Sequence, residues 1–174
     1  ALSTLRYSRT LIGNQLVTSA LATAGNERDP LIIGKQVLLT LSANPQVRSG
    51  GAGCQEALRT GLGSNPALLN FARSDARGRV QCSVLPFDAA VTFADEGWWQ
   101  RGIKTPGFTV SAVVIGQISR KRAIIGMQPI TLADGTNDGA ISVAIDASWL
   151  ERSLAASEMS RNAAVAIIDG DGKV

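Results

Sequence analysis

The sequence contains no histidine among its 174 residues. This excludes Ser-His-Asp and Cys-His catalysis and removes a common ligand of zinc. The acidic residues offer no substitute, because Asp95 and Glu96 are adjacent in the chain and do not form an opposed acid and base. The glycines of Gly61-Leu62-Gly63 lack the strand-to-helix context of a phosphate-binding loop. We therefore expect that the chain is not an enzyme and holds no cofactor or metal.

Aromatic residues are also scarce, at 5% of the chain, and charged residues make up only 18%. The net charge is +3, and the basic residues are scattered apart from one cluster at Arg120-Lys121-Arg122. Nucleic-acid surfaces need a stripe of Lys and Arg, and single-strand binders need stacking platforms. The composition therefore predicts no nucleic-acid partner.

No run of eighteen or more apolar residues occurs, so the sequence itself predicts no membrane span, and no signal peptide is visible. A hydrophobic content of 45% nevertheless indicates a folded core. The length fits one domain, or one domain plus the edge of a neighbour. Because the sequence begins inside an apparent helix, we expect flanking segments, membrane helices among them.

The pattern Asp-x-x-Gly-x-Val occurs twice, at 75–80 and 169–174, each time after an apolar stretch. Asp and Gly tolerate the backbone angles of a tight turn, so each copy predicts a strand, a turn and a second strand. The second copy ends the sequence. We expect residues 161–174 to begin a second module of a larger, tandem protein.

Hydrophobic periodicity predicts α+β architecture with five antiparallel strands and helices packed to one side. A long N-terminal helix is expected over residues 1–48, interrupted near 25–29 and ended by Asn44-Pro45. The domain that contains the sheet is expected over residues 49–160. Shorter helices are expected from Cys54, over 96–101 and over 149–159. The expected strands are 67–74, 79–85, 108–115, 122–132 and 140–145.

The two cysteines, Cys54 and Cys82, do not have metal-site spacing. From the residues alone, two interpretations stay open. The pair could be two buried thiols, or a disulfide that joins a helix to a strand in an oxidising compartment.

Features over nearly the whole chain occur in the order and spacing of one domain family. They are the helix end 41–47, the helix at Cys54, the hairpin 70–83, the pair Trp98-Trp99, the strands at 108–111 and 139–146 with Trp149-Leu150 after them, and the Asp-Gly turn at 168–172. Together they resemble the extracytoplasmic Cache family of PAS-like sensor domains, and the turn at 168–172 resembles the opening hairpin of a second, membrane-proximal module.

This resemblance implies a PAS-like five-stranded antiparallel sheet flanked by a long N-terminal helix. It also implies a periplasmic ligand-sensing domain, the membrane-distal module of a membrane-anchored double Cache receptor. Histidine kinase, diguanylate cyclase or chemoreceptor outputs would lie outside this chain. The resemblance favours the disulfide between Cys54 and Cys82. A small molecule of unknown identity would bind between the central sheet and the segment 86–107.

A different class of function is a structural module that binds nothing in this pocket. The N-terminal helix carries more apolar residues than one sheet edge needs, and we expect it to form a parallel homodimer. Burial at the two tryptophans and Gln128 distinguishes the alternatives. A roomy, partly polar cavity favours sensing, whereas a tightly packed core favours the structural module.

Candidate ligand residues follow from the implied pocket. Trp98 and Trp99 point in different directions on a short helix, so one is expected on the sheet and the other elsewhere, as pocket wall or as core packing. Arg101 would suit a carboxylate ligand, or is a solvated charge. The strand positions are Phe108, Ser111, Gln128 and Asp146.

Alternation sends Phe108 and Ser111 to opposite faces, and the sequence does not say which face holds the pocket. Gln128 lies in an apolar strand, so it either faces outward or needs a partner that a ligand would supply. Asp146 either binds the ligand or caps the helix that follows.

Amino-acid-binding Cache members carry an Arg shortly before a Trp-Tyr pair and an Asp further on. Here Ala94-Asp95-Glu96-Gly97 precede Trp98-Trp99, and residues 129–132 supply no Asp. We therefore expect another small molecule in the pocket, or none.

Overall fold

The structure is a computed structural model that describes residues 30–156, apart from the side chains of Leu150 and of residues 153–156. Residues 30–148 form one compact unit. The expected helix over 1–24, the dimer through it and the second Asp-x-x-Gly-x-Val hairpin lie outside the described residues and stay predictions. Within the described part of the chain, no helix is both long and apolar enough to cross a membrane.

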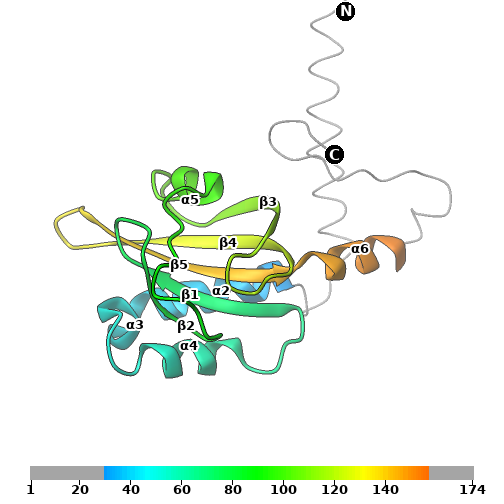
Figure 1. The fold of residues 1–174 in the computed structure, drawn as a ribbon, viewed down its shortest axis with the longest axis horizontal. Coiled ribbons are helices and arrows are strands. Elements are labelled where there is room, and N and C mark those ends of the chain that lie inside the picture. Colours follow the sequence, from blue (N-terminus) through cyan, green and yellow to red (C-terminus); the bar gives the residue numbers. More distant parts are fainter. Residues whose placement is uncertain (1–29, 157–174) are drawn as a thin grey trace, which may run out of the picture. The chain divides into compact units, whose positions relative to one another are not determined.

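The centre of the fold is a five-stranded antiparallel sheet, as predicted (Figure 1). Its strands are β1 (Leu68–Ser74), β2 (Val80–Ser83), β3 (Thr109–Ile115), β4 (Arg122–Thr131) and β5 (Asn137–Asp146). Their order across the sheet is β2-β1-β5-β4-β3, so β5 is central and β2 and β3 form the edges.

The first Asp-x-x-Gly-x-Val copy makes the predicted hairpin turn between β1 and β2. The Oδ1 atom of Asp75 accepts hydrogen bonds from the backbone N–H groups of Arg77 at 2.8 Å and Arg79 at 3.0 Å. Gly78 supplies the left-handed residue of the turn, with φ of 82°. Local turn chemistry therefore explains why this hairpin was predictable.

The helices of the described chain are α2 (Pro30–Ala43), α3 (Pro45–Ser49), α4 (Cys54–Leu62), α5 (Gly97–Gly102) and α6 (Ala147–Ala156). Helix α3 was not predicted from the sequence. The Asn44-Pro45 pair does end α2, but it also starts the next helix. Asn44 Oδ1 accepts from the N–H groups of Gln46 at 2.9 Å and Val47 at 3.4 Å, and Pro45 occupies the first turn.

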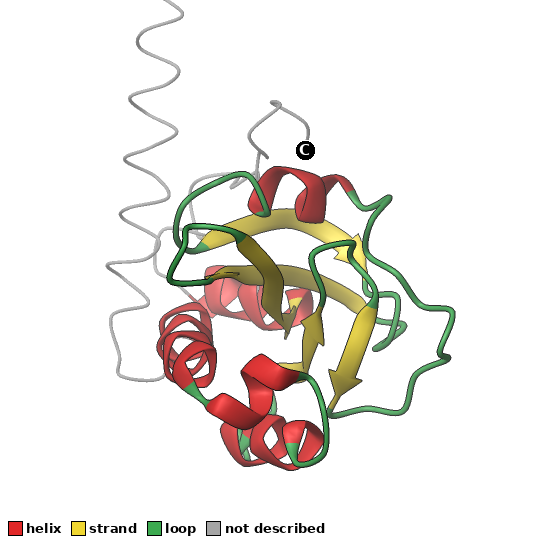
Figure 2. Cartoon of the chain, turned by 90° about the vertical axis from the view of Figure 1, so that its left-hand side faces the viewer, coloured by secondary structure: helices red, strands yellow, loops and turns green. Residues whose placement is uncertain are grey.

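Alternation along the strands builds two separate cores. On β5, Ile141, Val143 and Ile145 point to what we call the helix face, which α2, α3 and α4 cover (Figures 1 and 2). The buried residues of this core are Leu38, Leu41, Val47, Cys54, Leu58, Leu68, Phe71, Cys82, Ile130, Ile141, Val143 and Ile145.

The opposite side of the sheet, which we call the cavity face, is covered by the connecting segment (residues 84–107) that joins β2 to β3 and contains α5. The prediction that all helices pack on one side was therefore wrong for α5, which contacts β3 and β4 on this face. The buried residues here are Ala72, Val80, Phe93, Trp98, Trp99, Ala123, Ile125, Met127 and Ala140.

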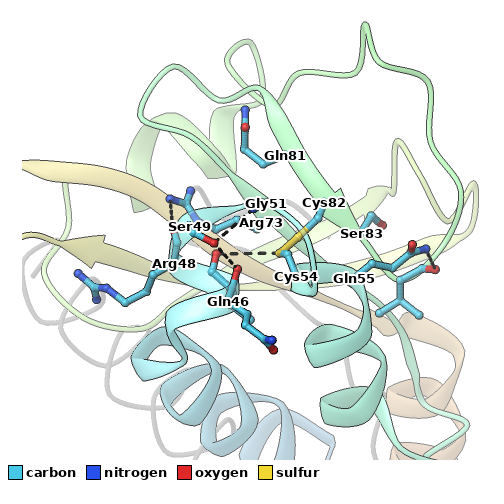
Figure 3. Close-up of a disulfide and its surroundings, with 12 residues drawn as sticks. Gln46, Arg48, Ser49, Gly51, Cys54, Gln55, Arg73, Gln81, Cys82 and Ser83 are labelled. Atoms are coloured by element: carbon cyan, nitrogen blue, oxygen red, sulfur yellow. Dashed lines mark hydrogen bonds between the residues drawn. A yellow bond between two sulfur atoms is a disulfide. The ribbon is translucent and has the colours of Figure 1, made fainter.

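A disulfide joins Cys54, the first residue of α4, to Cys82 in the edge strand β2 (Figure 3). The sequence left this pairing open, and the resemblance favoured it. Their Cα atoms lie 6.2 Å apart, within the normal range for a disulfide. The bond fixes the helical layer to the end of the sheet from which the connecting segment departs.

Beside the disulfide lies Arg73, which is 3% exposed and pairs with Cys82 across β1 and β2 (Figure 3). Its Nη2 atom donates to the backbone oxygen of Arg48 and to Asp138 Oδ2, each at 3.2 Å. Burial lowers the pKa of Arg73, and the carboxylate of Asp138 is the main opposing influence. Arg73 thus ties α3, β1 and the start of β5 together.

We expect the double substitution Cys54→Ala and Cys82→Ala to lower the free energy of unfolding by about 3–4 kcal/mol, because the bond closes a loop of 28 residues. Denaturant unfolding of the oxidised chain and of the variant measures this. Reduced wild-type protein serves as the control and is expected to match the variant. Thiols that titrate in the native, unreduced chain would contradict the bond itself.

Candidate ligand site

A small, partly open cavity of about 30 Å³ lies between the cavity face and the connecting segment. The sheet supplies its floor, and its walls come from the connecting segment and from the loop between β3 and β4. The lining residues are Asn70 and Ala72 of β1, Ile125 of β4, Ser142 and Ala144 of β5, Phe93, Glu96 and Trp98 of the connecting segment, and residues 115–119.

Trp98 forms one wall of this cavity. It is 9% exposed, and its ring lies 5.1 Å from the ring of Phe93 with an interplanar angle of 55°. A tilted aromatic pair of this kind is a favourable geometry. Trp98 is therefore both a core residue and a cavity residue, and its contact with a ligand stays a prediction.

Trp99 points elsewhere, as expected for adjacent residues on a short helix. Its indole Nε1 donates to Ser74 Oγ at 3.2 Å, and the side chain is 7% exposed. It does not line the cavity. Trp99 instead anchors α5 to β1, so it holds the connecting segment against the sheet.

Asn70 links the cavity floor to the beginning of the connecting segment. Its Oδ1 accepts from the backbone N–H of Leu85 at 3.0 Å, and its Nδ2 donates to Ser83 Oγ at 2.9 Å. Because Asn70 is only 4% exposed, its side-chain amide needs these hydrogen bonds in place of water. The sequence analysis missed this residue, although an Asn within the apolar run Leu68-Leu69-Asn70-Phe71 was a visible signal.

Glu96 and Gln117 meet at the cavity from two different loops. Gln117 Nε2 donates to Glu96 Oε1 at 2.6 Å, which joins the turn before α5 to the loop after β3. Both residues line the cavity, together with Ser142 on the floor. Sequence reasoning missed all three, because their loops and the facing of β5 decide that they converge.

Two predicted site residues lie on the other side of the sheet. Phe108 packs against the core on the helix face, and Lys35 Nζ lies 5.8 Å from the centre of its ring. Gln128 pairs with Ile141, whose side chain belongs to that same core. The Oε1 atom of Gln128 is buried and has no hydrogen-bond partner among the described residues. Neither residue reaches the cavity described above.

The remaining three predicted residues also lie outside this cavity. Ser111 Oγ accepts from the N–H of Ile125 at 2.9 Å, where the register of β3 and β4 shifts. Asp146 Oδ1 accepts from the N–H of Ser148 at 2.9 Å and from its Oγ at 2.7 Å, at the start of α6, which is the capping alternative. Arg101 is exposed on α5. Of the seven predicted residues, Trp98 alone lines the cavity, and ligand contacts for the others stay predictions.

A second, open hollow of about 430 Å³ lies beside the disulfide. Its lining comes from the loop before α4, from Gln55 of α4, from β2 and from residues 85–87, and none of these described lining residues is charged. The smaller cavity is the stronger candidate site, because polar side chains from the sheet, the connecting segment and the loop after β3 converge on it.

Proteins of known structure share this fold. No protein-family model and no curated protein matches the sequence. Solved structures do match. The ligand-binding domain of the Campylobacter jejuni chemoreceptor Tlp3, in complex with L-valine, has a TM-score of 0.62 at 16% identity, over 89% of this chain and 66% of that one. The chain has the fold of the Cache/PAS-like sensor domains.

Two further sensor domains have a similar fold. The Pseudomonas fluorescens chemoreceptor CtaA, in complex with L-serine, has a TM-score of 0.65 at 17% identity, over 86% of this chain and 66% of that one. The ligand-binding domain of the Pseudomonas aeruginosa PAO1 amino-acid chemoreceptor PctC, in complex with GABA, has a TM-score of 0.59 at 15% identity, over 82% of this chain and 67% of that one. This chain thus spans about two thirds of these domains. The predicted Cache/PAS-like fold is confirmed, and individual residue roles do not transfer at such identities.

Gly78 is a close contact point under the connecting segment, and we expect Gly78→Ala to be more destabilising than Gly135→Ala. The two residues have nearly equal φ values, 82° and 84°, so each substitution incurs a similar left-handed penalty of about 1–2 kcal/mol. A Cβ on Gly78 would lie 2.6 Å from the backbone nitrogen of Ala94, whereas none of the described atoms lies within 4 Å of one on Gly135.

Thermal or chemical unfolding of the two variants measures the difference. We expect Gly78→Ala to lose at least about 1 kcal/mol more than its matched control, because backbone must shift to relieve the contact. Equal losses would show that the connecting segment does not rest on Gly78.

We expect Asn70→Ala to lower the free energy of unfolding by about 1–3 kcal/mol, since it leaves the part-buried N–H of Leu85 without its acceptor. Ser83→Ala removes one partner of Asn70 but keeps the bond to Leu85, so its loss is expected to be smaller. Urea unfolding ranks the two, and hydrogen exchange at Leu85 reports the released amide. An unchanged exchange rate in Asn70→Ala would refute the link.

Proposed function

We propose that this chain is the extracytoplasmic ligand-sensing domain of a bacterial transmembrane signal-transduction receptor. The observation that carries the proposal is the partly polar cavity between the sheet and the connecting segment of a Cache/PAS-like fold. Binding sites in proteins are typically concave and mostly apolar, with a few convergent polar groups, and this cavity has that composition.

The polar lining supports a ligand rather than a packing defect. Empty cavities in proteins are apolar, whereas polar ones hold water or a ligand that satisfies their groups. Here Asn70, Glu96, Gln117 and Ser142 all reach a space of about 30 Å³. A ligand larger than a few atoms requires the connecting segment or the loop after β3 to move outward, and that movement would be the signal.

The extracytoplasmic location is supported by the disulfide between Cys54 and Cys82, since such bonds persist in oxidising compartments. Tlp3, CtaA and PctC are chemoreceptors. Anchoring of the full-length protein in the inner membrane, a periplasmic position and a kinase, cyclase or chemoreceptor output are part of this proposal. So is a second, membrane-proximal module after residue 160.

A second candidate function is a ligand-free signalling or dimerisation module, in which the N-terminal helix pairs with a second copy. The small size of the cavity and the burial of Trp98 and Trp99 favour it. In that case the connecting segment transmits packing changes, and no small molecule binds beneath it.

A thermal-stability screen of the 174-residue chain against amino acids, organic acids, amines and purines separates the two functions. A ligand that binds only the folded state stabilises it by about 2.7 kcal/mol at 100 times its Kd, so the melting temperature rises. The ligand-induced shift should be lost in Trp98→Leu, which alters the cavity wall.

Trp99→Leu is the matched control, because Trp99 belongs to the same helix and core but does not line the cavity. It should keep the ligand-induced shift even though its own stability falls. No shift anywhere in the panel would favour the ligand-free module, and a shift insensitive to Trp98 would move the site elsewhere.

A further inference from the structure

We infer that the cavity takes a small organic cation, an alkylammonium group without a carboxylate, bound between Glu96 and the aromatic rings of Phe93 and Trp98. This inference rests on the proposed function and names the ligand class of that same site. It follows from three features of the cavity: its charge, its aromatic wall and its hydrogen-bond acceptors.

The charge of the lining is the first feature. Among the described residues that line the cavity, Glu96 is the one with a charged side chain, and none is Lys or Arg. Arg101, the nearest basic residue along the chain after Trp98, is exposed on α5 and is not part of the lining. A ligand carboxylate would therefore lose its hydration beside a like charge and gain no cationic partner, whereas an ammonium would gain the carboxylate of Glu96 as an anionic partner.

The aromatic wall is the second feature. Phe93 and Trp98 both line the cavity, with ring centres 5.1 Å apart and a tilt of 55° between their planes. A cation over an aromatic face is attracted by the ring quadrupole, and tryptophan is the most effective of the aromatic side chains. Glu96 lies two residues before Trp98, so carboxylate and rings come from one short stretch of the connecting segment.

The acceptors are the third feature. Gln117 Nε2 donates to Glu96 Oε1 at 2.6 Å, which fixes the carboxylate at the cavity wall. A carboxylate has about four acceptor positions, so Glu96 can keep this bond and accept from an ammonium as well. Ser142 adds a hydroxyl from the floor. An ammonium has donors alone, so both the carboxylate of Glu96 and the hydroxyl of Ser142 can accept hydrogen bonds from it.

The cavity volume selects the probe. About 30 Å³ is space for little more than a water molecule, so the first probe is ethylammonium, with three non-hydrogen atoms. Ethanol is its uncharged isostere, acetate is a small anion, and glycine carries both an ammonium and a carboxylate. The chloride salt of ethylammonium is compared with sodium chloride at equal ionic strength.

Titration of the 174-residue chain, followed by amide chemical shifts, tests the inference. Ethylammonium should change the amide chemical shifts of residues 93–98 and 115–119 in a saturable way. Its affinity should be at least tenfold higher than that of ethanol, acetate or glycine. Glu96→Gln should weaken ethylammonium at least tenfold while keeping an acceptor for Gln117. Glu56→Gln is the matched control, because it removes the same charge from an exposed position on α4, and it should bind like the wild type.

Acetate or glycine binding more tightly than ethylammonium, or an unchanged affinity in Glu96→Gln, would overturn the inference and leave the sensing function intact. If none of the four probes binds, the stability screen decides. A larger amine that depends on Glu96 supports the inference, an anionic ligand overturns it, and a screen without any ligand removes both the inference and the proposed sensing function.

Discussion

The alternation of side chains across the central strand β5 is the constraint on which the structure depends. Ile141, Val143 and Ile145 are committed to the helix face, so Ala140, Ser142 and Ala144 must face the other way. The first set is large and apolar and is covered by helices. The second set is small, and it leaves room beneath the connecting segment. One strand therefore both completes the main core and opens the candidate site.

The connecting segment is held to this surface at several points, and the cavity lies between them. Asn70 holds its first residues, Gly78 supports Ala94, and Trp99 fixes α5 to Ser74. On the opposite face, the disulfide and the buried Arg73 keep the edge strand and the helices together. The turn before α5 and the loop after β3 are joined to each other by the hydrogen bond between Glu96 and Gln117.

Much of the architecture could be predicted from the sequence, because local chemistry determines it. The Asp75 turn, the five strands and the short helix carrying the tryptophans are each encoded within a few residues. The helix α3 was missed, because Asn44-Pro45 is as good a start signal as it is a stop signal. The disulfide needed the family resemblance, since two cysteines alone do not state their distance in space.

The candidate site was much harder to predict, because it depends on which way each strand faces. Register shifts interrupt β1 after Leu68 and β3 after Val110, and each shift changes the face of the residues beyond it. No sequence signal gives their position. Phe108 and Gln128 lie on the helix face, and the converging Asn70, Glu96 and Gln117 were not singled out.

Hydrogen exchange of the 174-residue chain, with and without its bound ligand, tests the central claim most directly. If the cavity is the sensing site, ligand should slow exchange in the connecting segment and at 116–121, and leave α4 unchanged. Protection confined to the helix face or to the hollow beside the disulfide would contradict the account, because the ligand would then bind away from the cavity.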